Sequence, residues 1–86
     1  MPVSHTSLIE RIARVIAARV VSINAGGDEA SAADRVDAIW CDYRDDALSV
    51  VRTLREPDPA MAEVGDVAIW ERMIEAALTE AGEAVD

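Results

Sequence analysis

Apolar residues recur every three or four positions along most of this chain, the spacing of one face of an α-helix. The first such stripe consists of Ile9, Ile12, Ile16, Val20 and Ile23, flanked by Leu8, Val15 and Val21. Ser7 and Glu10 stand at the start of this stripe with capping-box spacing, in which each residue can satisfy an exposed amide of the other. The pattern predicts a largely buried helix over residues 7–24, ended by the glycine-containing stretch 24–27.

A second stripe advances by alternating steps of four and three residues: Val36, Trp40, Tyr43, Ala47, Val50 and Leu54, with Ile39, Leu48 and Val51 beside it. A polar loop is expected over residues 28–33, and Ser31 with Asp34 resembles a cap pair at the start of the helix. The residue before Pro57 is disfavoured in helical conformation, so the helix must end before that point. One continuous helix over residues 32–55 is predicted, broad enough to contact two neighbours.

The last third of the chain carries two further helix starts. Asp58 followed by Pro59 is a cap with proline at the first helical position, which predicts a short helical turn over residues 59–64, closed by Gly65. Asp66 caps a final helix over residues 66–81. Its predicted buried stripe is Val67, Trp70, Ile74, Ala77 or Leu78, and Ala81, with Ile69 and Met73 alongside. Because no strand pattern occurs, we expect an all-α bundle of three main helices in a single domain, residues 1–86.

The size of the chain limits its core. It has 86 residues, and of its 51% apolar residues many are alanine, with no phenylalanine. A domain this small buries a low fraction of its surface, so we expect a homo-oligomer, a dimer or larger. The single cysteine, Cys41, excludes an internal disulfide framework, and we find neither a leader segment nor a membrane-length apolar run. These features predict a soluble cytoplasmic protein, and the exclusive use of arginine as the basic residue is typical of a high-GC bacterial genome.

Charge divides the chain unevenly. Residues 1–24 carry three Arg and one Glu, net +2, whereas residues 25–86 carry five Arg and sixteen acids, net −11. The basic first helix is either a phosphate-binding face or a helix that docks on the acidic remainder. A formal net charge of −9 argues against direct nucleic-acid binding, which needs clustered Lys and Arg.

The sequence assembles no catalytic set. His5 is the only histidine and lies far along the chain from Cys41, whose position beside Trp40 predicts a small buried thiol. Carboxylates at helical spacing could hold magnesium; the candidates are Asp42, Asp45 and Asp46, the pair Asp34 and Asp37, and the pair Glu71 and Glu75. Solvated helix faces are the ordinary explanation in so acidic a chain. We therefore predict no enzyme, no cofactor and no metal.

Arginines near aromatic residues are the remaining candidates for binding. Arg52 and Arg55 stand in the last turn of the second predicted helix, where a cation complements the helix dipole. Alternatively, arginines near Tyr or Trp could stack on and pair with a nucleotide or a carboxylate. The candidate ligand- or partner-binding residues are Tyr43, Arg44, Arg52, Arg55, Trp70, Asp42, Asp45 and Asp46.

Three motifs carry a resemblance: Trp40-x-x-Tyr43-Arg44, Leu54-Arg55-Glu56-Pro57-x-Pro59-x-Met61 and Trp70-x-x-Met73-Ile74-x-Ala76-Ala77-Leu78. Together they resemble a pattern in small uncharacterised helical proteins encoded by phages and prophages of high-GC proteobacteria. The resemblance covers roughly the C-terminal half. Relatives commonly have Ser or Thr in place of Pro59, and Ala in place of Val64.

This resemblance implies a phage-borne accessory protein without assigning an activity. Small acidic phage proteins often block host immunity or host enzymes, and patterned carboxylates can mimic phosphates and be steered to a basic groove. The leading hypothesis is a non-enzymatic inhibitor of a host defence or nucleic-acid-handling protein, with a host protein as its partner. The alternatives are an oligomeric sponge that sequesters a signalling nucleotide, and a structural or assembly component of a phage particle.

Overall fold

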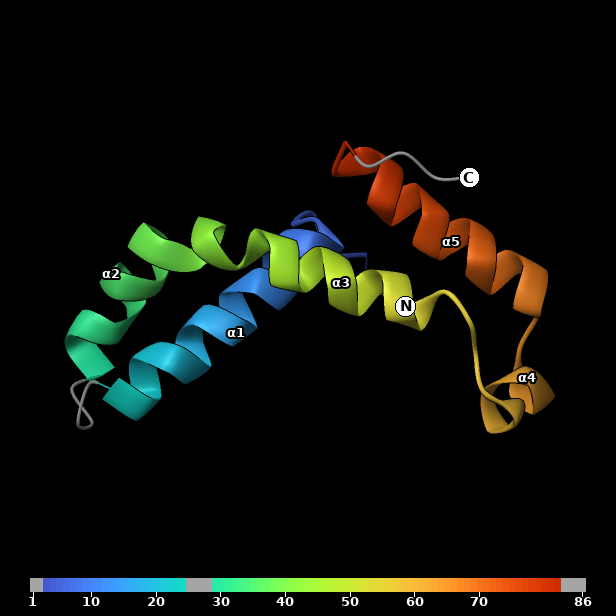
Figure 1. Ribbon diagram of the computed structural model, residues 1–86, viewed down its shortest axis with the longest axis horizontal. Helices are drawn as coiled ribbons and strands as arrows, with labels where there is room; N and C mark the ends of the chain where they lie inside the picture. Colours follow the sequence, from blue (N-terminus) through green and yellow to red (C-terminus); the bar gives the residue numbers. More distant parts are fainter. Residues whose placement is uncertain (1–2, 25–28, 83–86) are drawn as a thin grey trace.

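The computed structural model describes residues 3–24 and 29–82, and within these ranges every regular element is helical. The elements are α1 (Leu8–Asn24), α2 (Glu29–Ile39), the 3₁₀ helix η1 (Trp40–Tyr43), α3 (Arg44–Leu54), α4 (Pro59–Val64) and α5 (Val67–Glu80). The predicted all-α class is confirmed. Figure 1 shows α5 running alongside α3, and α4 beyond the end of α3, away from α1 and α2.

The predicted starts of three helices are confirmed by their caps. The Ser7 hydroxyl accepts a hydrogen bond of 3.1 Å from the Glu10 amide. The Asp58 carboxylate accepts one of 2.9 Å from Met61, and the Asp66 carboxylate one of 3.0 Å from Ile69. Each bond satisfies one of the amides that have no partner in the first turn of a helix.

The predicted single helix over residues 32–55 is wrong in two respects. It begins at Glu29, so the stretch expected to be a polar loop, with a cap at Ser31, is helical from residue 29 onward. Alanine, the strongest helix former, occupies three of the first five positions of α2. The chain then tightens into η1 at residues 40–43, and Figure 1 shows α2 and α3 running in different directions on either side of it.

The core forms where α1 meets α3 and the second half of α5. Its buried members are Ile9, Ala13, Ala47, Leu48, Val51, Ile74 and Leu78. Ala13 and Ala17 of α1 are completely buried, and α1 contacts α2, η1, α3 and α5. Small side chains at these positions let neighbouring helices approach α1 closely. The large residues predicted for this stripe, Ile12, Ile16 and Val20, are half-buried beside it.

Several apolar residues predicted to be buried are exposed: Val15, Val50, Leu54, Val67, Ile69 and Met73. In α3 the buried positions are Ala47, Leu48 and Val51, because this helix packs against both α1 and α5 while α2 packs mainly against α1 and η1. The predicted buried stripe assumed one straight helix. It fails because the chain changes direction at η1 and α3 has different neighbours from α2. Predictions that involve residues 25–28 and the side chains of Ile23 and Ser31 lie outside the described part of the chain.

The molecule is elongated for its length. Its principal extents are 43 × 27 × 23 Å, and its radius of gyration is 15.2 Å, whereas a compact chain of this length has a radius of about 12 Å. No helix in the described ranges has the length and apolar character needed to cross a membrane.

Candidate functional site

Three of the predicted binding residues fasten α5 to α3. An Arg44 guanidinium nitrogen donates to the carbonyl of Ala81 at the end of α5. At the opposite end of the pair, Arg55 forms an ion pair of 2.5 Å with Glu75. These contacts place arginine charge where α5 presents a carboxylate and a terminal carbonyl, so both arginines are engaged within the chain.

Trp70 makes the third contact between α3 and α5. Its indole nitrogen donates a hydrogen bond of 2.5 Å to the carbonyl of Leu54, the last residue of α3. This bond joins the first turn of α5 to the end of α3 across a gap of sixteen residues, and α4 lies within that gap. The indole therefore links the two ends of the chain segment that contains α4.

The other predicted binding residues do not converge on one site. Tyr43 is half-buried and packs against the core. Asp42 is exposed in the first turn of η1, while Asp45 and Asp46 occupy the first turn of α3, where a carboxylate complements the positive end of the helix. Arg52 is exposed in the last turn of α3.

Arg14 links the basic first helix to the acidic part of the chain. It pairs with Asp37 of α2 at 2.6 Å and with Glu10 at 2.8 Å, and its guanidinium lies 5.2 Å from the centre of the Trp40 ring. The hydrogen bonds that Arg14 donates to Asp37 and, to a smaller extent, to Glu10 raise the pKa of Arg14 above its ordinary value. The docking interpretation of the first helix is confirmed at this residue, whereas Arg11 and Arg19 are exposed.

The side chains that could bind a metal do not cluster in the part of the chain that the structure describes. No three His, Cys, Asp or Glu side chains there are placed to hold a metal ion. Cys41 was predicted to be a buried thiol and is exposed, because η1 turns the neighbouring Trp40 toward the core instead. His5 lines a polar depression with Arg11 and Glu80, and Cys41 is not part of its wall.

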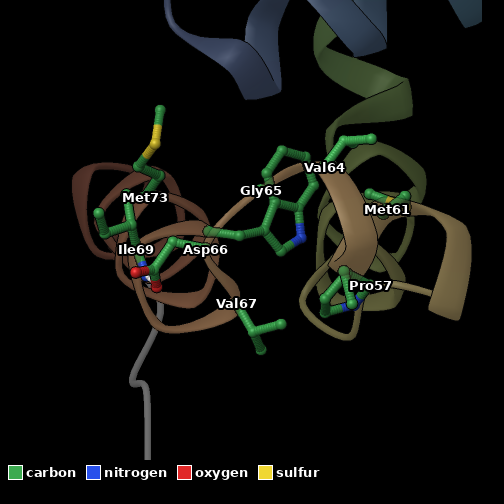
Figure 2. Close-up of a pocket in the computed structure, with 10 residues that line it drawn as sticks. Pro57, Met61, Val64, Gly65, Asp66, Val67, Ile69 and Met73 are labelled. Atoms are coloured by element: carbon green, nitrogen blue, oxygen red, sulfur yellow. Dashed lines mark hydrogen bonds between the residues drawn. The ribbon is translucent and has the colours of Figure 1, made fainter.

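An apolar hollow lies between α4 and the first half of α5. It has a volume of about 350 Å³ and almost wholly apolar walls. Its lining residues, here called the α4–α5 groove, are Pro57, Met61, Ala62, Val64, Gly65, Asp66, Val67, Ile69, Trp70 and Met73. Figure 2 shows Met61 and Pro57 on one side of the groove and Ile69 and Met73 on the other, with Gly65 and Asp66 between them.

Among residues 3–24 and 29–82, no other helix covers the groove. Every residue from 58 to 69 is exposed, and α4 has at most a minor contact with any other helix. Val64, the last residue of α4, is 89% exposed. Five large apolar side chains of the groove are therefore in contact with solvent: Met61, Val64, Val67, Ile69 and Met73.

The charge around the groove is mainly negative, and the exposed Arg72 stands next to the groove residue Met73. The stretch of residues 56–71, here called the acidic segment, contains five carboxylates and no basic residue. Its acids are Glu56, Asp58, Glu63, Asp66 and Glu71, and all five are exposed. An apolar centre with a charged margin is the usual composition of a protein-binding surface.

The total accessible surface area is large for a chain of this mass. The chain exposes 6241 Å², whereas a compact monomer of this mass exposes about 5,000 Å². The surplus of about 1,200 Å² exceeds the roughly 800 Å² that each partner contributes to a standard protein interface.

Of the residues that line the groove, only Trp70 was among the predicted binding residues, because the apolar positions of α5 were assigned to one buried stripe. Ile69 and Met73 are four residues apart and share one face of α5, while Ile74 and Leu78 share another. One helix face cannot bury both pairs. The sequence did contain a signal for the groove. It places two separate apolar faces on α5, next to a short helix bounded by Pro57 and Gly65.

Comparisons with known proteins leave the site to be interpreted from its own geometry. A scan against models of protein families, a search of curated proteins and a search of solved structures each find no match to this chain.

Proposed function

We propose that this chain is a non-enzymatic binding protein that inhibits a host defence or nucleic-acid-handling protein by covering a basic, partly apolar surface. The observation that carries the proposal is the acidic segment, whose five exposed carboxylates accompany an exposed apolar groove. Carboxylates arranged on a surface compete with phosphates for arginines and lysines and steer the encounter. The apolar groove then supplies contact area that a nucleic acid lacks.

The resemblance of the C-terminal half to small phage and prophage proteins supports this biological setting. Its three motifs include Leu54, Met61 and Met73, which lie at or next to the groove. The nucleotide-sponge hypothesis requires Arg44, Arg55 and Trp70 to turn toward a ligand. Because all three make contacts between α3 and α5, we favour the inhibitor.

The test is capture of partners from a bacterial lysate on the immobilised chain. We expect the captured proteins to be nucleic-acid-handling proteins, to elute as salt is raised, and to be displaced by excess DNA or heparin. Screening of charges beyond a Debye length explains the salt dependence. Capture that resists both salt and polyanions would contradict an acidic recognition surface, as would the absence of any captured protein.

A pair of matched variants tests which carboxylates contribute to binding of the partner. Replacing Glu56, Glu63 and Glu71 by Gln removes three charges from the acidic segment and leaves both helix caps, Asp58 and Asp66, in place. The control replaces three exposed acids elsewhere: Asp34→Asn, Asp42→Asn and Glu80→Gln. Both variants have the same net charge, so capture should fall in the first and persist in the second. Equal loss in both would mean that net charge alone, and no particular surface, governs binding.

A further inference from the structure

We infer that the α4–α5 groove receives the apolar face of a short amphipathic helix of the partner protein, with Lys or Arg flanking its apolar anchors. This inference rests on the proposed function and identifies the kind of segment that is bound. Three properties of the groove lead to it: the state of its backbone, the chemistry of its walls and the charge at its margin.

The backbone of the groove offers no edge for an extended peptide. Its two walls are helices, whose amides and carbonyls bond within each helix, and Asp58 and Asp66 each cap a first-turn amide. No strand occurs in residues 3–24 or 29–82 to which a peptide could add. An occupant must therefore satisfy its own backbone hydrogen bonds, and a helix does so while presenting side chains on one face.

The walls suit inserted apolar side chains. A volume of about 350 Å³ lies at the low end of ligand pockets, and its lining contributes almost no polar surface. Met61 and Met73 lie on opposite sides of it, as Figure 2 shows, and methionine side chains adapt to the shape of what they contact. Apolar residues spaced three and four apart on the incoming helix would enter between these two walls.

The charge beside the groove favours a positively charged helix as the bound segment. The acidic segment has a net charge of −5, so a helix with Lys or Arg beside its anchors gains attraction on approach. A second copy docked on the same groove would bring five more carboxylates to this surface, and like charges facing each other disfavour association. The groove is therefore suited to a basic segment of another protein and poorly suited to a second copy of this chain.

The experiment uses the full chain, labelled with ¹⁵N, and synthetic amphipathic peptides of about 15 to 18 residues, long enough to hold a helix. The probe peptide has Leu at positions i, i+3, i+4 and i+7 and Lys on the flanks. Trp70 lines the groove while Trp40 lies under Arg14, so the two indole N–H signals report on different places. We expect the probe to shift the Trp70 signal and leave that of Trp40 unchanged, with Trp70→Phe assigning the two signals.

Two control peptides separate charge from apolar contact. One replaces each Lys by Glu and the other replaces each Leu by Ser. Both should bind at least about tenfold more weakly than the probe, and binding of the probe should weaken as salt rises from about 0.05 to 0.5 M. Equal binding of the Ser peptide would overturn the inference, since attraction to the acidic surface would then need no groove.

A matched pair of variants locates the binding. Val64 and Val15 are both exposed helical valines, at 89% and 63%, and only Val64 lines the groove. Val64→Glu should weaken binding of the probe at least about tenfold, the effect of losing one anchoring contact of about 1.4 kcal/mol. Val15→Glu adds the same charge and should bind as the unmodified chain does. Equal binding by both variants would overturn the inference.

The outcome also separates this inference from the proposed function. If lysate partners are captured through the acidic segment while the probe leaves Trp70 unaffected, the groove inference fails and the inhibitor proposal survives. Sedimentation equilibrium tests a second copy as the occupant: a dimer that Val64→Glu dissociates and Val15→Glu does not would assign the groove to self-association and contradict a basic partner helix.

Discussion

The two halves of α5 carry similar apolar residues in opposite environments. Ile74 and Leu78 in the second half are buried against α3 and α1, whereas Val67, Ile69 and Met73 in the first half are in contact with solvent. The difference lies in what faces each half. α3 ends at Leu54, so the Trp70 indole marks the last point at which α5 has a packed neighbour.

This contrast teaches that apolar character alone does not define the core of a chain this short. Two packed neighbours are needed to bury a helix on both sides, and residues 55–66 supply only the six-residue α4. A small domain lacks the chain length to cover every apolar face. The face left open is the one that we propose to be functional, and the substitutions below test whether the two halves differ in solution as they do in the structure.

The largest effect is expected at Leu48, which is 2% exposed in the middle of α3. Leu48→Ala removes buried contacts and leaves a cavity. We expect it to lower the free energy of unfolding by about 2 to 5 kcal/mol. Urea denaturation followed by circular dichroism measures the loss. A change in the free energy of unfolding below about 1 kcal/mol would mean that the packed region is not the core.

A smaller effect is expected at the boundary between the two regions. Trp70→Phe keeps an aromatic ring and removes the hydrogen bond to the Leu54 carbonyl, so we expect a loss of about 1 to 2 kcal/mol. Hydrogen exchange should show faster opening of the first turn of α5 in this variant, while the amides of α1 remain protected. Unchanged exchange in α5 would indicate that the indole bond does not hold the two helices together.

Loss of a helix cap should have unequal effects at the two equivalent positions. Asp66→Ala removes the cap of α5, whose far end is packed, and should cost about 1 kcal/mol in global unfolding. Asp58→Ala removes the same bond from α4, which has at most a minor contact with any other helix, and should mainly increase local exchange of α4 amides. Equal costs in global unfolding would show that α4 is part of the cooperative core.

The smallest effect on folding is expected at Val64. Val64→Ser should change the free energy of unfolding by less than about 0.5 kcal/mol, because the side chain is already in contact with water. The same substitution should reduce binding to a captured partner, which surface plasmon resonance can measure. A strongly destabilised Val64→Ser protein would contradict an open groove and place this valine in a folded interior.

The binding residues could be predicted only in part from the sequence. Arg44, Arg55 and Trp70 were predicted to bind a ligand or partner, and in the structure each makes a polar contact between α3 and α5. Their partners, the Ala81 carbonyl, Glu75 and the Leu54 carbonyl, lie between sixteen and thirty-seven residues away along the chain. Local patterns carry no information on such pairs, and the inhibitor hypothesis itself stays a prediction.

The sequence by itself determined the all-α class and the starts of α1, α4 and α5, because a cap is a bond between residues three apart and needs no distant neighbour. Only the tertiary structure decided where η1 interrupts the second helix and which apolar face of α5 is buried. Both depend on how α1 and α3 lie against the rest of the chain. Packing also left the α4–α5 groove open, since burial requires a neighbour and α3 ends before it reaches the groove.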